Sequence, residues 1–171
     1  MILLYAVTLF VSATLVFAVQ PLFTKMVLPL LGGTPAVWTT AMMFFQGLLL
    51  LGYAFAHALD RLASGRRQAL IQLAALGAGA LVLPIAIGDA WRPPADADPI
   101  FWLLALLAAS VGLPFFALSA TAPLLQRWFA ASGHARAADP YPLYGASNAG
   151  SYVTTGNGTG GTGTVLASTT R

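Results

Sequence analysis

The side chains that could do chemistry in this 171-residue chain lie in apolar stretches near its start. Between residues 36 and 59, polar side chains recur after seven, seven and four residues, a spacing that places them on one stripe of an α-helix. Polar groups within apolar runs are unusual in lipid unless the protein uses them. With one amide in the preceding run, they form a candidate polar stripe or solute path: Gln20, Thr39, Gln46, Tyr53 and His57.

The same stripe has a structural interpretation, in which its hydrogen-bonding groups hold neighbouring helices together. An amide without a partner at mid-membrane depth costs on the order of several kcal/mol. On either interpretation we therefore expect Gln46 and His57 to face other helices and not lipid. Gln20, across the corner of the chain from Gln46, is its candidate partner.

A cluster of charges follows directly, in the segment DRLASGRR at 60–67. It is similar to the Asp-Arg and Gly-Arg-Arg signature between helices two and three of major facilitator transporters, with extra residues between its halves. That resemblance implies a conformational-lock loop that holds helix ends in one state. The alternative is a loop whose arginines only set membrane orientation. The residues concerned are Asp60, Arg61, Arg66 and Arg67.

Composition argues against most enzymatic chemistry in this chain. There is no cysteine, which excludes disulfides, thiolate nucleophiles and cysteine-bound metals. There is no glutamate, and the aspartates lie in polar segments between apolar runs, so no carboxylate pair is available within the membrane. His57 and His134 have no second ligand at a suitable spacing, so we predict no metal and no cofactor. The glycine-rich segment 156–164 lacks the surroundings of a phosphate loop.

The elements that position the polar stripe are apolar runs long enough to cross a bilayer. The chain is 58% hydrophobic and 8% charged, where soluble domains have about a quarter charged residues. A hydrocarbon core of roughly 30 Å takes about 20 helical residues. We predict spans at about 2–23, 36–59, 68–88 and 100–121.

Glycine and proline at 32–35 predict a tight corner between the first two spans. After Gln20-Pro21 the chain either continues the first helix past a kink or lies along the interface. Cleavage of a signal peptide after Ala18 is disfavoured, because no basic segment precedes the apolar run.

Two weaker elements follow the fourth span. After Pro123, apolar side chains share a face opposite Arg127, which indicates an amphipathic helix lying in the interface. Residues 141–152 begin like a fifth helix, but the chain then changes to Gly, Thr, Asn and Ser, which cannot offset the cost of ordering. We expect an all-α membrane protein: a bundle of four transmembrane helices at 1–122, an interfacial helix and the start of an incomplete fifth helix at 123–151, and a disordered Gly/Thr-rich tail at 152–171.

Basic residues predict the orientation. Three arginines follow the second span and two, Arg127 and Arg136, follow the fourth, while the segment after the third span is net acidic. The positive-inside rule then places these segments and the N-terminus in the cytoplasm. Lys25 is expected near the outer interface, with its ammonium group reaching water. The scattered basic residues do not form the clustered face that nucleic acid requires, so the expected partners are membrane lipids.

Three segments resemble the N-terminal membrane region of spermidine-synthase-like integral membrane proteins, in which a major-facilitator-like helical region precedes an aminopropyltransferase-like domain. They read VQPLFTKMVLPLLGGTPAVWTT at 19–40, FFQGLLLLGYAFAH at 44–57 and SATAPLLQRWFAASGHARAADPYPLYGASNAGS at 119–151. The resemblance implies a bacterial inner-membrane location and, for the catalytic domain, polyamine synthesis from a decarboxylated S-adenosylmethionine donor.

Because the chain ends before such a domain, we expect a truncated, non-catalytic membrane region. Its partner would be a downstream catalytic domain or further helices. The alternative is a small transporter or half-transporter of the major facilitator type, whose polar stripe binds a solute.

Overall fold

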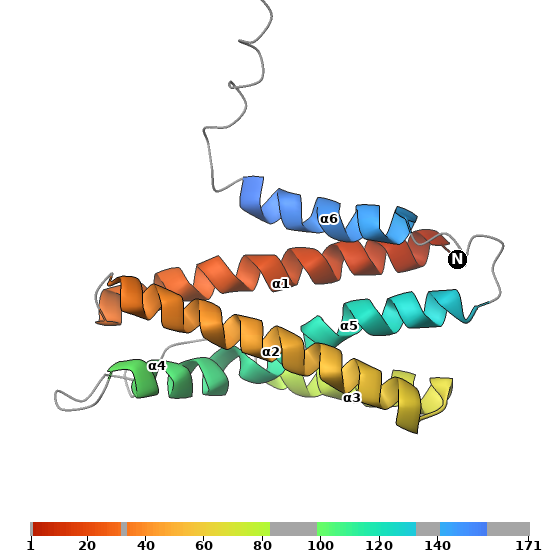
Figure 1. The fold of residues 1–171 in the computed structure, drawn as a ribbon, viewed down its shortest axis with the longest axis horizontal. Helices are drawn as coiled ribbons and strands as arrows, with labels where there is room; N and C mark the ends of the chain where they lie inside the picture. The colour runs from red at the N-terminus through yellow and green to blue at the C-terminus, as the bar shows by residue number, and fades with distance from the viewer. Residues whose placement is uncertain (1, 32–33, 83–98, 133–140, 157–171) are drawn as a thin grey trace, which may run out of the picture.

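The computed structural model describes residues 2–31, 34–82, 99–132 and 141–156, and the elements in these ranges are all helical (Figure 1). α1 and α2 run antiparallel, and α6 lies beside α1 and runs in the same direction. The predicted all-helical class is confirmed for these ranges. The elements are α1 (Ile2–Leu31), α2 (Pro35–Leu62), α3 (Gly65–Leu81), α4 (Pro99–Leu107), the π-helical turn η1 (Ala108–Gly112), α5 (Leu113–Ala130) and α6 (Tyr141–Gly156).

The first helix continues past its proline. α1 has 30 residues with Pro21 and Pro29 inside it, so of the two alternatives the chain takes the continuous helix. Phe23 and Val27, which follow Pro21, are buried in the core, and this packing holds the second half of α1 in line. At the corner, Pro35 occupies the first turn of α2, where its missing N–H leaves no helical bond unmade.

The helical stretch formed by α4, η1 and α5 is the centre of the fold. α5 packs against α1, α2 and α3, so the two arms of the hairpin meet this stretch more than they meet each other. The rings of Phe45 and Phe115 lie 5.0 Å apart at the α2–α5 contact. The main core cluster draws on α1, α2 and the central stretch: Val16, Phe23, Val27, Val37, Ala41, Phe45, Leu103, Leu106, Leu107, Val111 and Phe115.

A π-helical turn precedes Pro114, a residue type that usually kinks a helix. A proline ring clashes with the carbonyl one turn earlier and offers no N–H to it. η1 covers residues 108–112 and ends two residues before Pro114. The wider turn accommodates the proline without breaking the helix, which is one of the usual causes of a bend.

Three helical stretches are long and apolar enough to cross a membrane: Ile2–Pro29, Pro35–Leu62 and Pro99–Ala130. Large apolar side chains on their outer faces, including Leu3, Met43 and Leu50, are exposed, as expected of helices that face lipid. The third predicted span is described only as α3, whose 17 residues end at Leu81. Residues 83–88 of that span, His134, Arg136 and residues 157–171 of the tail lie outside the described residues.

Residues 123–130 do not form the separate interfacial helix that the sequence suggests. They are the last turns of α5, which continues through Pro123. Leu124 and Phe129 share the predicted apolar face, but this face is buried against other helices: Leu124 packs with α2, and Phe129 packs with α1 and α6. The amphipathic pattern therefore reflects helix packing, a distinction that sequence periodicity alone does not make.

α6 packs closely on α1 through a glycine. A Cβ on Gly150 would lie 2.5 Å from the carbonyl oxygen of Phe10, so only glycine allows this approach. Thr14 Oγ1 donates a hydrogen bond of 3.4 Å to the Gly150 carbonyl oxygen. The predicted start of a helix at Tyr141 is confirmed, and the helix runs to Gly156, beyond its expected end at 151.

Candidate functional site

A cavity of about 280 Å³ lies between the C-terminal parts of α2 and α5. The residues from α2 follow one another at intervals of three, one and three, the i, i+3 and i+4 spacing of a single helix face. The cavity combines a phenol, an imidazole, a carboxylate and a guanidinium with apolar walls. Its lining is Tyr53, Ala56, His57 and Asp60 from α2, and Pro123, Leu124 and Arg127 from α5.

An ion pair joins the two helices at this cavity. Arg127 Nε–H donates toward both carboxylate oxygens of Asp60, at 3.0 Å to Oδ1 and 2.9 Å to Oδ2. The side chain of Arg127 is 62% exposed and that of Asp60 28% exposed. Exposed ion pairs contribute about 0.2–1 kcal/mol. The link between α2 and α5 is therefore weak enough to break without unfolding either helix.

The cavity includes two of the five residues of the polar stripe. Tyr53 and His57 line it, each with part of its surface exposed. Thr39 and Gln46 are exposed farther along α2, and Thr39 Oγ1 donates to the Pro35 carbonyl oxygen of its own helix at 2.9 Å. Gln20 is half-buried on α1. The described helices thus do not assemble all five residues into one path.

The expectation that Gln46 and His57 face other helices is not met for Gln46, whose side chain is exposed; His57 is also exposed, but it lines the cavity between α2 and α5. The reason lies in how α2 packs. Its buried face, which meets α5 and the core, carries small and apolar residues, and the polar stripe lies one residue farther round the helix. The buried residues of α2 are Val37, Ala41, Phe45, Gly52, Ala56 and Leu59.

The residues of the predicted conformational-lock loop mostly belong to helices. Asp60 and Arg61 lie in the last turn of α2, and Arg66 and Arg67 lie in the first turn of α3. The three arginines are exposed. The ion pair of Asp60 is made across the fold to Arg127 of α5, a pairing that the sequence did not predict.

A second polar link, between α3 and α5, was missed by our sequence reasoning. Trp128 Nε1–H donates to Gln68 Oε1 at 2.6 Å, and Gln72 Nε2–H donates to the Ala117 carbonyl oxygen at 2.8 Å and to Thr121 Oγ1 at 2.9 Å. Both glutamines are buried. Their spacing of four residues in an apolar helix is the signal that could have found them.

Among the described residues, no group of three or more His, Cys, Asp or Glu side chains could hold a metal ion. Comparison with known proteins gives no match: no protein family, curated protein or solved structure is significantly similar to this chain. The described residues define an all-helical fold with three candidate membrane-spanning helices.

Proposed function

We propose that this chain is a non-catalytic membrane region of a spermidine-synthase-like, polyamine-related protein, and that Asp60 and Arg127 form a releasable link between its α2 and α5 ends. The resemblance of segments 19–40, 44–57 and 119–151 supports the family, and the long apolar helices support the membrane. The single observation that carries the releasable link is the exposed ion pair at a cavity.

The proposal includes four membrane spans, with α3 as the fourth. α3 lies along α5 within the bundle, as a membrane-spanning neighbour would (Figure 1). The described arginines lie where α2 and α5 end and α3 begins, and by the positive-inside rule this supports a cytoplasmic position for this end. The exposed Lys25 lies near the opposite end of α1. The arginines concerned are Arg61, Arg66, Arg67 and Arg127.

The cavity has the chemistry to receive an amine. Asp60 supplies a carboxylate, which attracts an ammonium group, while Tyr53 and His57 supply hydrogen-bonding atoms beside it. The guanidinium group of Arg127 already forms an ion pair with this carboxylate. A polyamine that bound Asp60 would compete with Arg127 and thereby break the ion pair between the ends of α2 and α5.

A small transporter or half-transporter is the second candidate. The observation that favours it is the same ion pair, because a weak link between the ends of two helices could open and close one side of a solute site. Thr39 and Gln46 are exposed, so they do not extend a solute path through the described helices.

Binding and uptake of radiolabelled spermidine by the purified chain in proteoliposomes test both candidates. The proposal predicts saturable binding that Asp60→Asn weakens at least fivefold, with no net uptake. Arg61→Gln is the matched control, because Arg61 is the next residue in the sequence but does not line the cavity. Saturable uptake would instead establish the transporter, and the absence of binding would contradict a polyamine site.

A further inference from the structure

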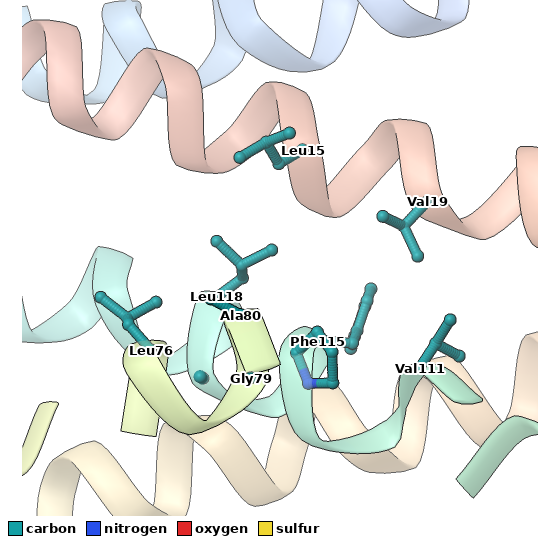
Figure 2. Close-up of a pocket in the computed structure, with 10 residues that line it drawn as sticks. Leu15, Val19, Leu76, Gly79, Ala80, Val111, Phe115 and Leu118 are labelled. Atoms are coloured by element: carbon teal, nitrogen blue, oxygen red, sulfur yellow. The ribbon is translucent and has the colours of Figure 1, made fainter. Parts of the chain in front are cut away.

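Three hollows follow one another along α1. The first, about 300 Å³, lies between α1, α3 and the central helix (Figure 2). The second, about 280 Å³, shares Leu15, Leu76 and Leu118 with the first. The third, also about 280 Å³, shares Thr8 with the second and ends at Trp128. We call these three adjoining hollows the α1–α3 groove; α5 forms its floor, and α1 and α5 alone line the third hollow.

The groove exists because α1 and α3 both pack on α5 but make little contact with each other. Gly79 brings α3 close to the central helix, since a Cβ there would lie 3.0 Å from Pro114 Cα. On the other side, Ser12 Oγ donates to the Leu118 carbonyl oxygen at 3.3 Å and holds α1 to the same helix. The two walls are thus fixed separately, and the space between their outer parts stays open.

The hollow in Figure 2 is lined only by apolar residues, with Leu15 and Val19 on α1 facing Leu76 and Ala80 on α3. A water molecule there would lack the polar partners that a buried water needs. The groove follows α1 from Leu4 to Val19, about 22 Å at 1.5 Å per residue. One leaflet contributes roughly 15 Å of hydrocarbon, so an acyl chain has sufficient room.

A transmembrane helix does not fit this space. A helix with its side chains is about 10–12 Å across, which a hollow of about 300 Å³ does not admit. An acyl chain is far thinner and adapts to the bends between the three hollows. The shape therefore favours lipid over a second copy of this chain.

The end of the groove at Trp128 carries aromatic and basic residues. Tyr5 and Trp128 line it there, and rings of these types commonly lie at headgroup level. Trp128 is bonded to Gln68, which brings the start of α3 to this end. Arg66 is exposed two residues before Gln68 and fourteen before Ala80, close to four full turns, so it lies toward the groove side of α3.

The geometry points to a phospholipid site: the α1–α3 groove holds one acyl chain of an anionic phospholipid from the leaflet at the arginine-bearing end, with its phosphate beside Arg66. This inference rests on the chain being inserted in a membrane, and it does not depend on the polyamine proposal. Arginines in the first turn of α3 complement the negative headgroup, as basic residues at the ends of membrane helices do in other lipid sites.

Native mass spectrometry of the full chain in detergent tests the site. The probes are phosphatidylglycerol and phosphatidylcholine with identical acyl chains. We expect one tightly retained phosphatidylglycerol per chain, with at least a fivefold preference over phosphatidylcholine. Ala80→Phe, which fills the groove, should lower retention of both lipids at least fivefold. Ala78→Phe is the matched control, since Ala78 is exposed on α3 but does not line the groove.

A second pair of variants tests the headgroup without altering the groove. Arg66→Gln should remove most of the preference for phosphatidylglycerol. Arg67→Gln should not, because Arg67 precedes Leu76 by nine residues, about two and a half turns, and so lies on the opposite side of α3. Equal retention of the two lipids by the unmodified chain would overturn the inference. Unchanged lipid retention in Ala80→Phe would also overturn it. So would the finding that the unmodified chain forms a dimer and that Ala80→Phe alone among the variants does not.

Discussion

Gly52 of α2 lies so close to Ser119 of α5 that a Cβ on residue 52 would overlap the Ser119 hydroxyl oxygen. The hydroxyl is held by its own hydrogen bond of 2.8 Å to the Phe116 carbonyl oxygen. Rotation of Ser119 would not solve the overlap, because its Cβ and the Ala120 backbone nitrogen would also be within 3.2 Å. This contact sets how closely α2 and α5 approach, directly beside the cavity, whose lining on α2 starts at Tyr53.

Gly52→Ala should therefore lower the free energy of unfolding by about 1–3 kcal/mol, the usual cost of overpacking. Thermal unfolding in detergent measures it. Gly47→Ala is the control on the same helix, because a Cβ at Gly47 meets nothing within 4 Å. Alanine there should stabilise the helix by up to about 1 kcal/mol. Equal melting temperatures for the two variants would show that the α2–α5 contact is looser than described.

The contact of α6 with α1 makes a second prediction. Gly150→Ala should push α6 away from the Phe10 carbonyl oxygen and raise amide exchange throughout residues 141–156 roughly tenfold or more, which corresponds to about 1.4 kcal/mol. Gly145→Ala places a Cβ in open space and should leave exchange unchanged or slower. Hydrogen exchange read by mass spectrometry compares them. Identical exchange in both variants would mean that α6 is not held by this contact.

The two buried glutamines of α3 should respond differently to loss of their amides. Gln68→Leu leaves the Trp128 indole N–H without its acceptor, at a cost of about 1–3 kcal/mol. Gln72→Leu should cost less than about 1 kcal/mol. It removes a buried Oε1 that accepts no hydrogen bond from the described residues, and Thr121 Oγ1 still donates to Ala117. Chemical unfolding of both variants tests the order; the reverse order would be inconsistent with this network.

Local signals in the sequence were enough to predict the hairpin and the apolar helices. The corner is predicted from the glycine and proline residues at 32–35, and the helices are predicted from uninterrupted apolar runs. Both predictions depend only on residues that are close together in the sequence. The prediction of a separate helix after Pro123 is wrong, because the effect of a proline depends on whether other helices hold the chain straight on both sides of it. They do, so α5 continues to Ala130.

The candidate site was predictable only in part. Tyr53 and His57 follow from helical spacing, and the structure brings them to one cavity with Asp60, which we expected in a loop. Arg127 is 67 residues from Asp60, and their pairing depends on the register of α2 against α5, which the sequence pattern does not specify. The stripe residues Thr39 and Gln46 share the helical spacing but do not line the cavity. Periodicity predicts that residues share one face of a helix, but it does not predict which helices pack against that face.

The releasable link is tested most directly by the distance between the ends of α2 and α5. The chain has no cysteine, so spin labels can be attached at Arg61→Cys and Ala130→Cys, both exposed positions. A second pair, Ala36→Cys and Ala105→Cys, reports on the opposite end as a control.

Electron–electron double resonance in lipid nanodiscs gives both distance distributions. We predict that Asp60→Asn, or added spermidine, broadens and lengthens the distribution for the pair 61–130 and leaves the pair 36–105 unchanged. A distribution for 61–130 that stays the same under both treatments would contradict a releasable Asp60–Arg127 link.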